Sequence, residues 1–234
     1  MTIPGSMKLE SLRDLIVAML FVLTSTLAWA PSSRAELFKL DNVLKSCQGR
    51  YGPPAGPALR DWHNALSVFQ GDSEQNKLKE INEFFNRRLR FEDDQKIWGQ
   101  NDYWATPVEA LVKGMADCED YAIAKYFSLK YLGVSVTKMR VTYVKAKIGG
   151  PSSSLVQAHM VLTYYPTPDA EPMVLDNLVG EIRPASRRPD LTPVFSFNTD
   201  GVWAAGSTEP QQGGSRLSRW NDLLEKVKAE GFEQ

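Results

Sequence analysis

Hydrophobic positions in the first part of the chain recur at the three- and four-residue spacing of amphipathic helices. This pattern predicts helices over residues 36–48, 59–70 and 74–89. On the third segment, Leu78 and Ile81 begin an apolar stripe of the kind that faces a core. The folded domain is therefore expected to begin with a group of packed helices.

Helix-start signals mark the middle of the chain. Thr106 is a favourable N-cap, Pro107 suits the first helical position, and Glu109 is placed to complete a capping box. A second helix, over residues 118–132, is expected to begin directly after Asp117, whose side chain can cap it.

Beyond residue 133 the hydrophobic period changes from helical to alternating, which is typical of strands. The predicted elements are strands over residues 136–147, 158–165 and 173–178, a hairpin of 193–197 and 201–204, and a final helix over 216–228. Helices followed by an antiparallel sheet predict an α+β fold.

The N-terminus has the pattern of a secretory signal peptide. Lys8 and Arg13 precede an apolar run over residues 15–27, and an A-x-A cleavage pattern ends at Ala30. The alternative is a membrane anchor, but the run is shorter than the roughly 20 apolar residues that a span needs. We therefore expect a signal peptide over 1–30 and a single exported domain over 31–234, which no longer spans a membrane once the signal is cleaved.

Composition narrows the possible partners. The chain has 234 residues, of which 43% are hydrophobic and 24% are charged, and its formal net charge is −1. These values are typical of a globular domain with its own core. Without a strongly basic balance, nothing in the charge points to nucleic acid as a partner.

The segment Asp117-Cys118-Glu119-Asp120 places a thiol among three carboxylates. Neighbouring anions disfavour the thiolate, because like charges oppose ionisation. The start of a helix has the opposite effect, since its free N–H groups favour a thiolate. Either Cys118 is an inert structural residue, or the carboxylates are neutralised and the thiol is reactive.

The chain has two histidines, which limits the possible partners of a reactive thiol. His159 and Asp176 lie on neighbouring predicted strands, where they can meet on one face. A carboxylate on one imidazole nitrogen leaves the other nitrogen for the thiol. His63 lies on a predicted helix and is interpreted as a surface or packing residue. Each residue could instead be structural, and Cys118 could form a disulfide with Cys47 in an exported protein.

Several blocks of the sequence resemble the bacterial transglutaminase-like cysteine proteinases. The similar segments are residues 102–107, 114–122, 157–162, 174–178 and 187–194. The resemblance implies a papain/transglutaminase-like core with the nucleophile at the start of a central helix. It assigns Cys118 as the nucleophile, His159 as the general base and acid, and Asp176 as the orienting carboxylate.

The resemblance also implies dependence on Ca²⁺. Asp117, Glu119 and Asp120 match the acidic residues that surround the cysteine in this family, and Asp102 and Asn101 in the preceding loop are weaker ligand candidates. Carboxylate and amide oxygens are the hard ligands that Ca²⁺ prefers. The alternative is that these acids are solvated or favour the helix N-terminus without metal.

The function implied by the resemblance is that of a calcium-dependent cysteine endopeptidase of the periplasm. Its expected substrate is the N-terminal region of a large surface adhesin, cut at a paired-alanine site so that biofilm disperses. Its expected partner is an inner-membrane cyclic-di-GMP receptor whose periplasmic domain sequesters the proteinase. The alternatives are a protein-glutamine transferase of the same fold and a non-catalytic, calcium-responsive binding module in which Cys118 is bridged to Cys47.

Overall fold

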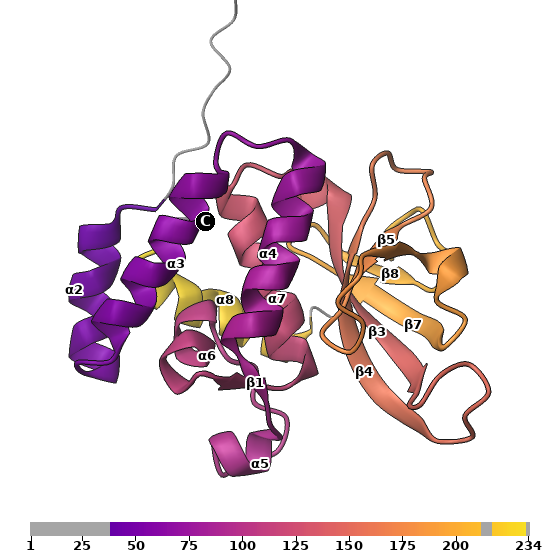
Figure 1. The fold of residues 1–234 in the computed structure, drawn as a ribbon, viewed down its shortest axis with the longest axis horizontal. Helices are drawn as coiled ribbons and strands as arrows, with labels where there is room; N and C mark the ends of the chain where they lie inside the picture. The colour runs from indigo at the N-terminus through magenta and orange to yellow at the C-terminus, as the bar shows by residue number, and fades with distance from the viewer. Residues whose placement is uncertain (1–37, 212–216, 233–234) are drawn as a thin grey trace, which may run out of the picture. The chain divides into compact units, whose positions relative to one another are not determined.

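The helices of the first half of the chain pack on one side of an antiparallel sheet (Figure 1). The computed structural model describes residues 38–211 and 217–232. Within these ranges no helix combines the length and the apolar character needed to cross a bilayer. The predicted signal peptide, residues 1–30, lies outside the described residues, so the division of the chain at residue 30 stays a prediction.

Three helices begin at the predicted residues 74, 107 and 118, two others begin four residues from their predicted starts, and the short helix over residues 94–97 was not predicted. The helices are α2 (Leu40–Tyr51), α3 (Ala55–Phe69), α4 (Glu74–Arg88), α5 (Asp94–Ile97), α6 (Pro107–Lys113), α7 (Cys118–Tyr131) and α8 (Ser218–Ala229). The predicted capping box is present in α6, where Thr106 accepts from the Glu109 N–H and Glu109 accepts from the Thr106 N–H. The start of α4 has a similar local cap, since the Ser73 side chain accepts from the Asn76 N–H. Caps of this kind use hydrogen bonds within one turn, which is why the sequence predicts these two starts.

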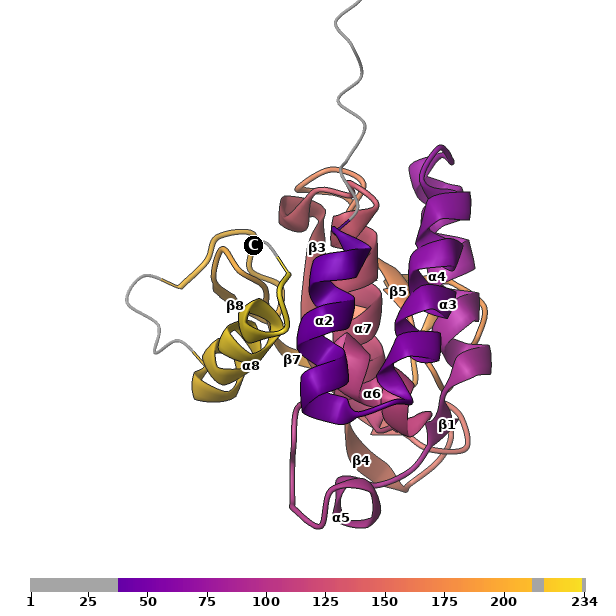
Figure 2. The same ribbon diagram turned by 90° about the vertical axis from the view of Figure 1, so that its left-hand side faces the viewer.

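Helix α7 is the centre of the fold. It packs against β3 and β4 of the sheet on one side and against α4 on the other. It is therefore buried on nearly all sides and has no polar face. Even Lys125 is buried in it. Helix α8 lies beside the sheet strand β7 (Figure 2), and Trp220 contacts the rings of Phe127 and Phe197 there.

In the described part of the chain the main sheet has six strands, and every neighbouring pair is antiparallel. They are β3 (Met139–Lys147), β4 (Val156–Tyr164), β5 (Met173–Leu175), β6 (Arg183–Pro184), β7 (Leu191–Phe197) and β8 (Val202–Ala204), in the order β6-β5-β4-β3-β7-β8. The predicted hairpin is formed by β7 and β8. The predicted α+β architecture is confirmed.

A small parallel pair, which the sequence did not predict, joins two distant segments. Strand β1 (Arg90–Phe91) pairs with β2 (Met115–Ala116), and the Arg90 and Glu92 N–H groups donate to carbonyl oxygens of residues 114 and 116. Two residues per strand are too few for a periodic signal. The pair nevertheless brings the segment after α4 alongside the segment that leads into Cys118.

Two local predictions near the cysteine and the aspartate were wrong. Asp117 occupies the N-cap position of α7, but its side chain makes no capping hydrogen bond. Strand β5 ends at Leu175, so Asp176 follows the strand instead of lying within it. In both places a side chain is engaged in a tertiary cluster, described below, that overrides the local preference.

Candidate active site

Cys118 is the first residue of α7 and lies in a cleft of about 630 Å³. Walls of this cleft come from β3, β4, β7 and the start of α8, which contribute Tyr143, Met160, Phe195 and Arg219. The thiol Sγ is 3.1 Å from the Glu119 carboxylate. Burial, followed by the charges of Glu119 and Asp117, raises the pKa of the Cys118 thiol well above its usual value.

His159 on β4 and Asp176 after β5 form a buried pair, with His159 Nε2 2.8 Å from Asp176 Oδ1. The register of the two strands pairs Leu162 with Leu175. Continued by one residue, it places Asp176 level with Val161, on the same face as His159 and diagonal to it. Two residues 17 positions apart in sequence therefore meet because the two strands are antiparallel neighbours.

The carboxylate of Asp176 accepts hydrogen bonds from three groups. Besides His159, the Leu178 N–H donates to Oδ1 at 3.0 Å and Arg188 Nη2 lies 2.7 Å from Oδ2. Burial raises the pKa of Asp176, but the hydrogen bond and charge of His159, with these further donors, outweigh burial and lower it to about 2. An ionised carboxylate only accepts, so the His159 Nε2 carries the proton of this bond.

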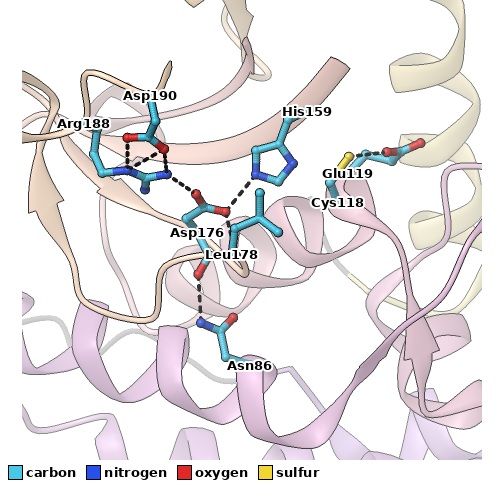
Figure 3. Close-up of polar contacts among 8 residues, drawn as sticks. All are labelled: Asn86, Cys118, Glu119, His159, Asp176, Leu178, Arg188 and Asp190. Atoms are coloured by element: carbon cyan, nitrogen blue, oxygen red, sulfur yellow. Dashed lines mark hydrogen bonds and ion pairs between the residues drawn. The ribbon is translucent and has the colours of Figure 1, made fainter. Parts of the chain in front are cut away.

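The second imidazole nitrogen of His159 points toward the side on which Cys118 lies (Figure 3). Within the described part of the chain no hydrogen bond joins the Cys118 thiol to this nitrogen, and the thiol contacts Glu119 instead. The chain thus brings the predicted cysteine, histidine and aspartate to one place, with the imidazole between the other two (Figure 3).

An acidic cluster lies on the other side of the cysteine. Oxygen atoms of Asp94, Asp117 and Glu119 all lie within 4.8 Å of one another. Asp94 comes from α5 and reaches the other two because β1 and β2 pair just before them. Asp120 adjoins the cluster, and its Oδ1 accepts from the Ala105 N–H at 2.7 Å.

Several oxygens of this cluster are buried without a donor. Among the residues that the structure describes, none donates a hydrogen bond to Asp94 Oδ1, Asp117 Oδ1 or Asp120 Oδ2. Burial, followed by the charges of the neighbouring carboxylates, raises the pKa of Asp117. Burial is also the largest cause that raises the pKa of Asp94, to about 6, and the pKa of Asp120. Buried and unpartnered carboxylate oxygens fit a hard cation such as Ca²⁺, which takes oxygen ligands.

The structure does not place the two weaker ligand candidates in this cluster. The Asp102 carboxylate forms an ion pair with Arg219 and accepts from Trp104 Nε1 at 3.0 Å. Asn101 is exposed beside it. Asp94 was not predicted as a ligand. In the sequence it resembles its neighbour Asp93, and only the fold buries Asp94 beside Asp117 and Glu119 while Asp93 is exposed.

The remaining cysteine and histidine lie away from the cleft. Cys47 is buried on α2, and both cysteines are free thiols, so the disulfide that the non-catalytic alternative requires is not formed. His63 is half-buried on α3, and its ring meets the Phe38 ring edge to face with the two centroids 5.3 Å apart. It is a packing residue, as the sequence suggested.

A thiol at a helix start, facing a histidine–carboxylate pair on an antiparallel sheet, is the arrangement of papain- and transglutaminase-like cysteine enzymes. Residues 61–191 match the family described as bacterial transglutaminase-like cysteine proteinase. The chain belongs to this family, as the resemblance predicted.

Solved structures of one relative extend the similarity to most of the chain. Legionella pneumophila LapG is 37% identical to this chain, and the two structures match with a TM-score of 0.68 over 82% of this chain and 99% of that chain. A calcium-bound form of LapG covers 80% of this chain and 98% of that chain with a TM-score of 0.68, and an EGTA-treated form covers 82% and 100% with 0.70. No curated protein matches the chain. The transglutaminase-like fold predicted from the sequence is confirmed.

Proposed function

We propose that this protein is a calcium-dependent cysteine endopeptidase of the periplasm. Cys118 is the nucleophile, His159 is the general base and acid, and Asp176 orients the imidazole. The observation that carries the proposal is the buried pair of His159 and Asp176, with Nε2 2.8 Å from Oδ1, whose other ring nitrogen points toward the side of Cys118 at the start of α7 (Figure 3).

The reaction follows from these positions. His159 Nδ1 takes the proton of the Cys118 thiol, and the sulfur attacks a peptide carbonyl carbon. The Cys118 backbone N–H, free at the helix start, donates to the oxyanion that forms. The imidazolium then protonates the departing amine, which leaves a thioester. Water, deprotonated by His159, attacks this thioester and releases the acid product and the thiol.

The acidic cluster accounts for the calcium requirement. Asp94, Asp117, Glu119 and Asp120 would hold the ion, and their unpartnered oxygens support this assignment. Bound Ca²⁺ would offset the negative charge that now disfavours the Cys118 thiolate. The calcium-bound form of LapG, at 37% identity, further supports calcium as the cation.

The substrate under this proposal is the N-terminal region of a large surface adhesin, cut at a paired-alanine site so that biofilm disperses. An inner-membrane cyclic-di-GMP receptor sequesters the enzyme through its periplasmic domain. This substrate and this partner are the ones that the resemblance of the sequence to the family implies. One wall of the cleft is aromatic, because the rings of Tyr143 and Phe195 stack there with their centroids 5.3 Å apart.

The test is cleavage of a purified adhesin N-terminal fragment by the mature chain, with and without EGTA. Wild-type protein is expected to give two products, EGTA to stop the reaction, and excess Ca²⁺ to restore it. Cys118→Ala is expected to abolish cleavage, whereas the matched variant Cys47→Ala, which removes the other thiol, retains it. Cleavage by Cys118→Ala would disprove the nucleophile assignment.

The same assay distinguishes the endopeptidase from the alternative functions. Crosslinked or amine-labelled fragment, in place of two shorter products, would favour a protein-glutamine transferase. Absence of a free Cys118 thiol in protein isolated from the periplasm would instead favour the non-catalytic binding module.

A further inference from the structure

Arg188 is an arginine buried behind the histidine–aspartate pair. It is 2% exposed and directly follows the short 3₁₀ segment Ala185–Arg187. Its Nη2 lies 2.7 Å from Asp176 Oδ2, on the far side of the carboxylate from His159 (Figure 3). A buried charge of this kind needs a partner, and Arg188 has two.

Asp190 is the second partner of Arg188. The Asp190 carboxylate accepts from Arg188 Nε at 3.0 Å and from Nη2 at 2.7 Å. One guanidinium therefore joins Asp176 and Asp190 through a fixed fork of donors. This two-sided contact suits arginine in particular, because a lysine ammonium is a single point charge without the planar fork.

Asp176 is also held through its backbone. Asn86 on α4 donates from Nδ2 to the Asp176 carbonyl oxygen at 2.8 Å (Figure 3). Together with the Leu178 N–H on Oδ1, these contacts fix the residue from several elements. Because Arg188 occupies Oδ2, the oxygen that meets His159 is Oδ1.

The charges around Asp176 are balanced. His159 on β4 and Arg188 contact it directly, and Asp190 lies behind Arg188. Buried Lys125 on α7 is a further cation whose charge interacts with Asp176. Arg188 is the only one of these groups that both contacts the free side of the carboxylate and is itself anchored by a second acid.

We propose that Arg188 is a positioning residue of this site: anchored by Asp190, it holds Asp176 Oδ2 so that Oδ1 fixes His159 with Nε2 protonated and Nδ1 facing Cys118. The inference rests on the proposed function, because it assigns a purpose to the orientation of His159. It adds a charged residue, distant from the thiol, on which that orientation depends.

The direct test reads the imidazole of His159 by ¹⁵N NMR in untagged Cys118→Ala protein. The chain has two histidines, so the spectrum contains two rings, and loss of one signal in His63→Asn assigns the other. In the parent, neutral His159 is expected as a single Nε2–H tautomer. Arg188→Met is expected to give a mixture of tautomers, whereas Arg187→Met, which changes the exposed neighbouring arginine, leaves the spectrum unchanged. An unchanged tautomer in Arg188→Met overturns the proposal.

The second readout is cleavage of the adhesin fragment by proteins that retain Cys118. Arg188→Met is expected to lower kcat about 10- to 100-fold, the range typical of residues that orient a catalytic side chain, with little change in KM. Arg188→Lys keeps the charge and is expected to recover part of kcat. If Arg188→Met fails to fold, Arg188→Lys decides: wild-type kcat and tautomer in this variant would contradict the proposal.

The two proposals fail separately. If wild-type protein cuts no fragment while His159 still changes tautomer in Arg188→Met, the endopeptidase assignment is wrong and the positioning of His159 by Arg188 stands. If wild-type protein cuts the fragment and Arg188→Met matches it in both readouts, the positioning role is wrong and the endopeptidase assignment stands.

Discussion

Two groups of buried carboxylates flank the proposed nucleophile, and they differ in what surrounds them. Asp176 is 1% exposed and meets His159 and Arg188, which together lower its pKa to about 2. Asp94 and Asp120 are equally inaccessible, at 5% and 1% exposed, but each keeps an unpartnered oxygen and a raised pKa. Burial is similar in the two groups, so the difference comes from the cations that the chain supplies.

The two sides of the site differ in whether the chain itself supplies a cation to its buried carboxylates. On the sheet side, Arg188 supplies a cation from within the chain, and Asp176 is paired with both Arg188 and His159. On the helix side, the described residues supply backbone N–H donors to Asp94 and Asp120 but no cation that pairs with them. Under the proposed function, dependence on calcium therefore belongs to the half built from Asp94 and its neighbours.

The largest expected effect comes from removing one charge of the acidic cluster. Asp94→Asn preserves the shape of the side chain and is expected to weaken Ca²⁺ binding about tenfold or more, because affinity follows the number of charged ligands. Cleavage should then need correspondingly more Ca²⁺. Isothermal titration of calcium-stripped protein measures the affinity.

The matched control for this change is Asp93→Asn, which removes the adjacent, exposed carboxylate. It is expected to bind Ca²⁺ nearly as wild type does. Equal affinities in the two variants would show that Asp94 is not a ligand. The unpartnered oxygen of Asp94 would then have no role in binding Ca²⁺.

An intermediate effect is expected on the pH dependence of stability. Because the folded-state pKa of Asp94 is raised from 3.8 to about 6, its contribution is fully present below the unfolded value and is lost as pH rises through this window. Asp176, lowered from 3.8 to about 2, has the opposite sign: its contribution is present above 3.8 and is lost as pH falls toward 2.

Thermal denaturation of calcium-stripped protein measures both slopes. Its Tm is expected to fall by several degrees, about 5 °C, between about pH 4 and pH 6. Asp94→Asn should flatten this fall, and saturating Ca²⁺ at neutral pH should raise the wild-type Tm by a similar amount. A calcium-stripped protein whose Tm rises across this window would mean that the acids are compensated within the chain.

The smallest expected effect concerns two asparagines on α4 that hold the segment after β5. Asn86 donates to the carbonyl of Asp176, and Asn82 donates to the carbonyl of Gly180, each at 2.8 Å. Asn86→Ala is expected to lower kcat about 2- to 5-fold through looser placement of Asp176, about the effect of one neutral hydrogen bond. Asn82→Ala should lower Tm similarly but leave kcat near wild type. Equal kcat values in the two variants would argue that α4 only stabilises this segment.

Much of the fold could be predicted because the signals are local. The capping box at Thr106 and Glu109 uses hydrogen bonds within one turn, so a few residues determine where α6 begins. The alternation that predicts β3 and β4 likewise arises from successive side chains facing opposite sides of a sheet. The pair β1–β2 has two residues in each strand and no such signal.

The sequence likewise indicates some residues of the candidate site and not others. Cys118, His159 and Asp176 stand out by residue type and by resemblance to a family, so the sequence indicates them. Asp94 does not stand out, because the chain has many aspartates and this one lies outside the similar segments. Arg188 lies within the similar segment 187–194, but its residue type and neighbours indicate no contact with Asp176. Their surroundings depend on contacts between segments far apart in sequence.

By itself, the sequence determined the α+β order of the elements, the start of α7 at Cys118 and the identity of the family. Only the tertiary structure decided which carboxylates near the thiol are compensated by the chain and which are not. The physical reason is that interaction between charges depends on distance and burial, and pairing of distant strands, such as β1 with β2 and β4 with β5, sets both.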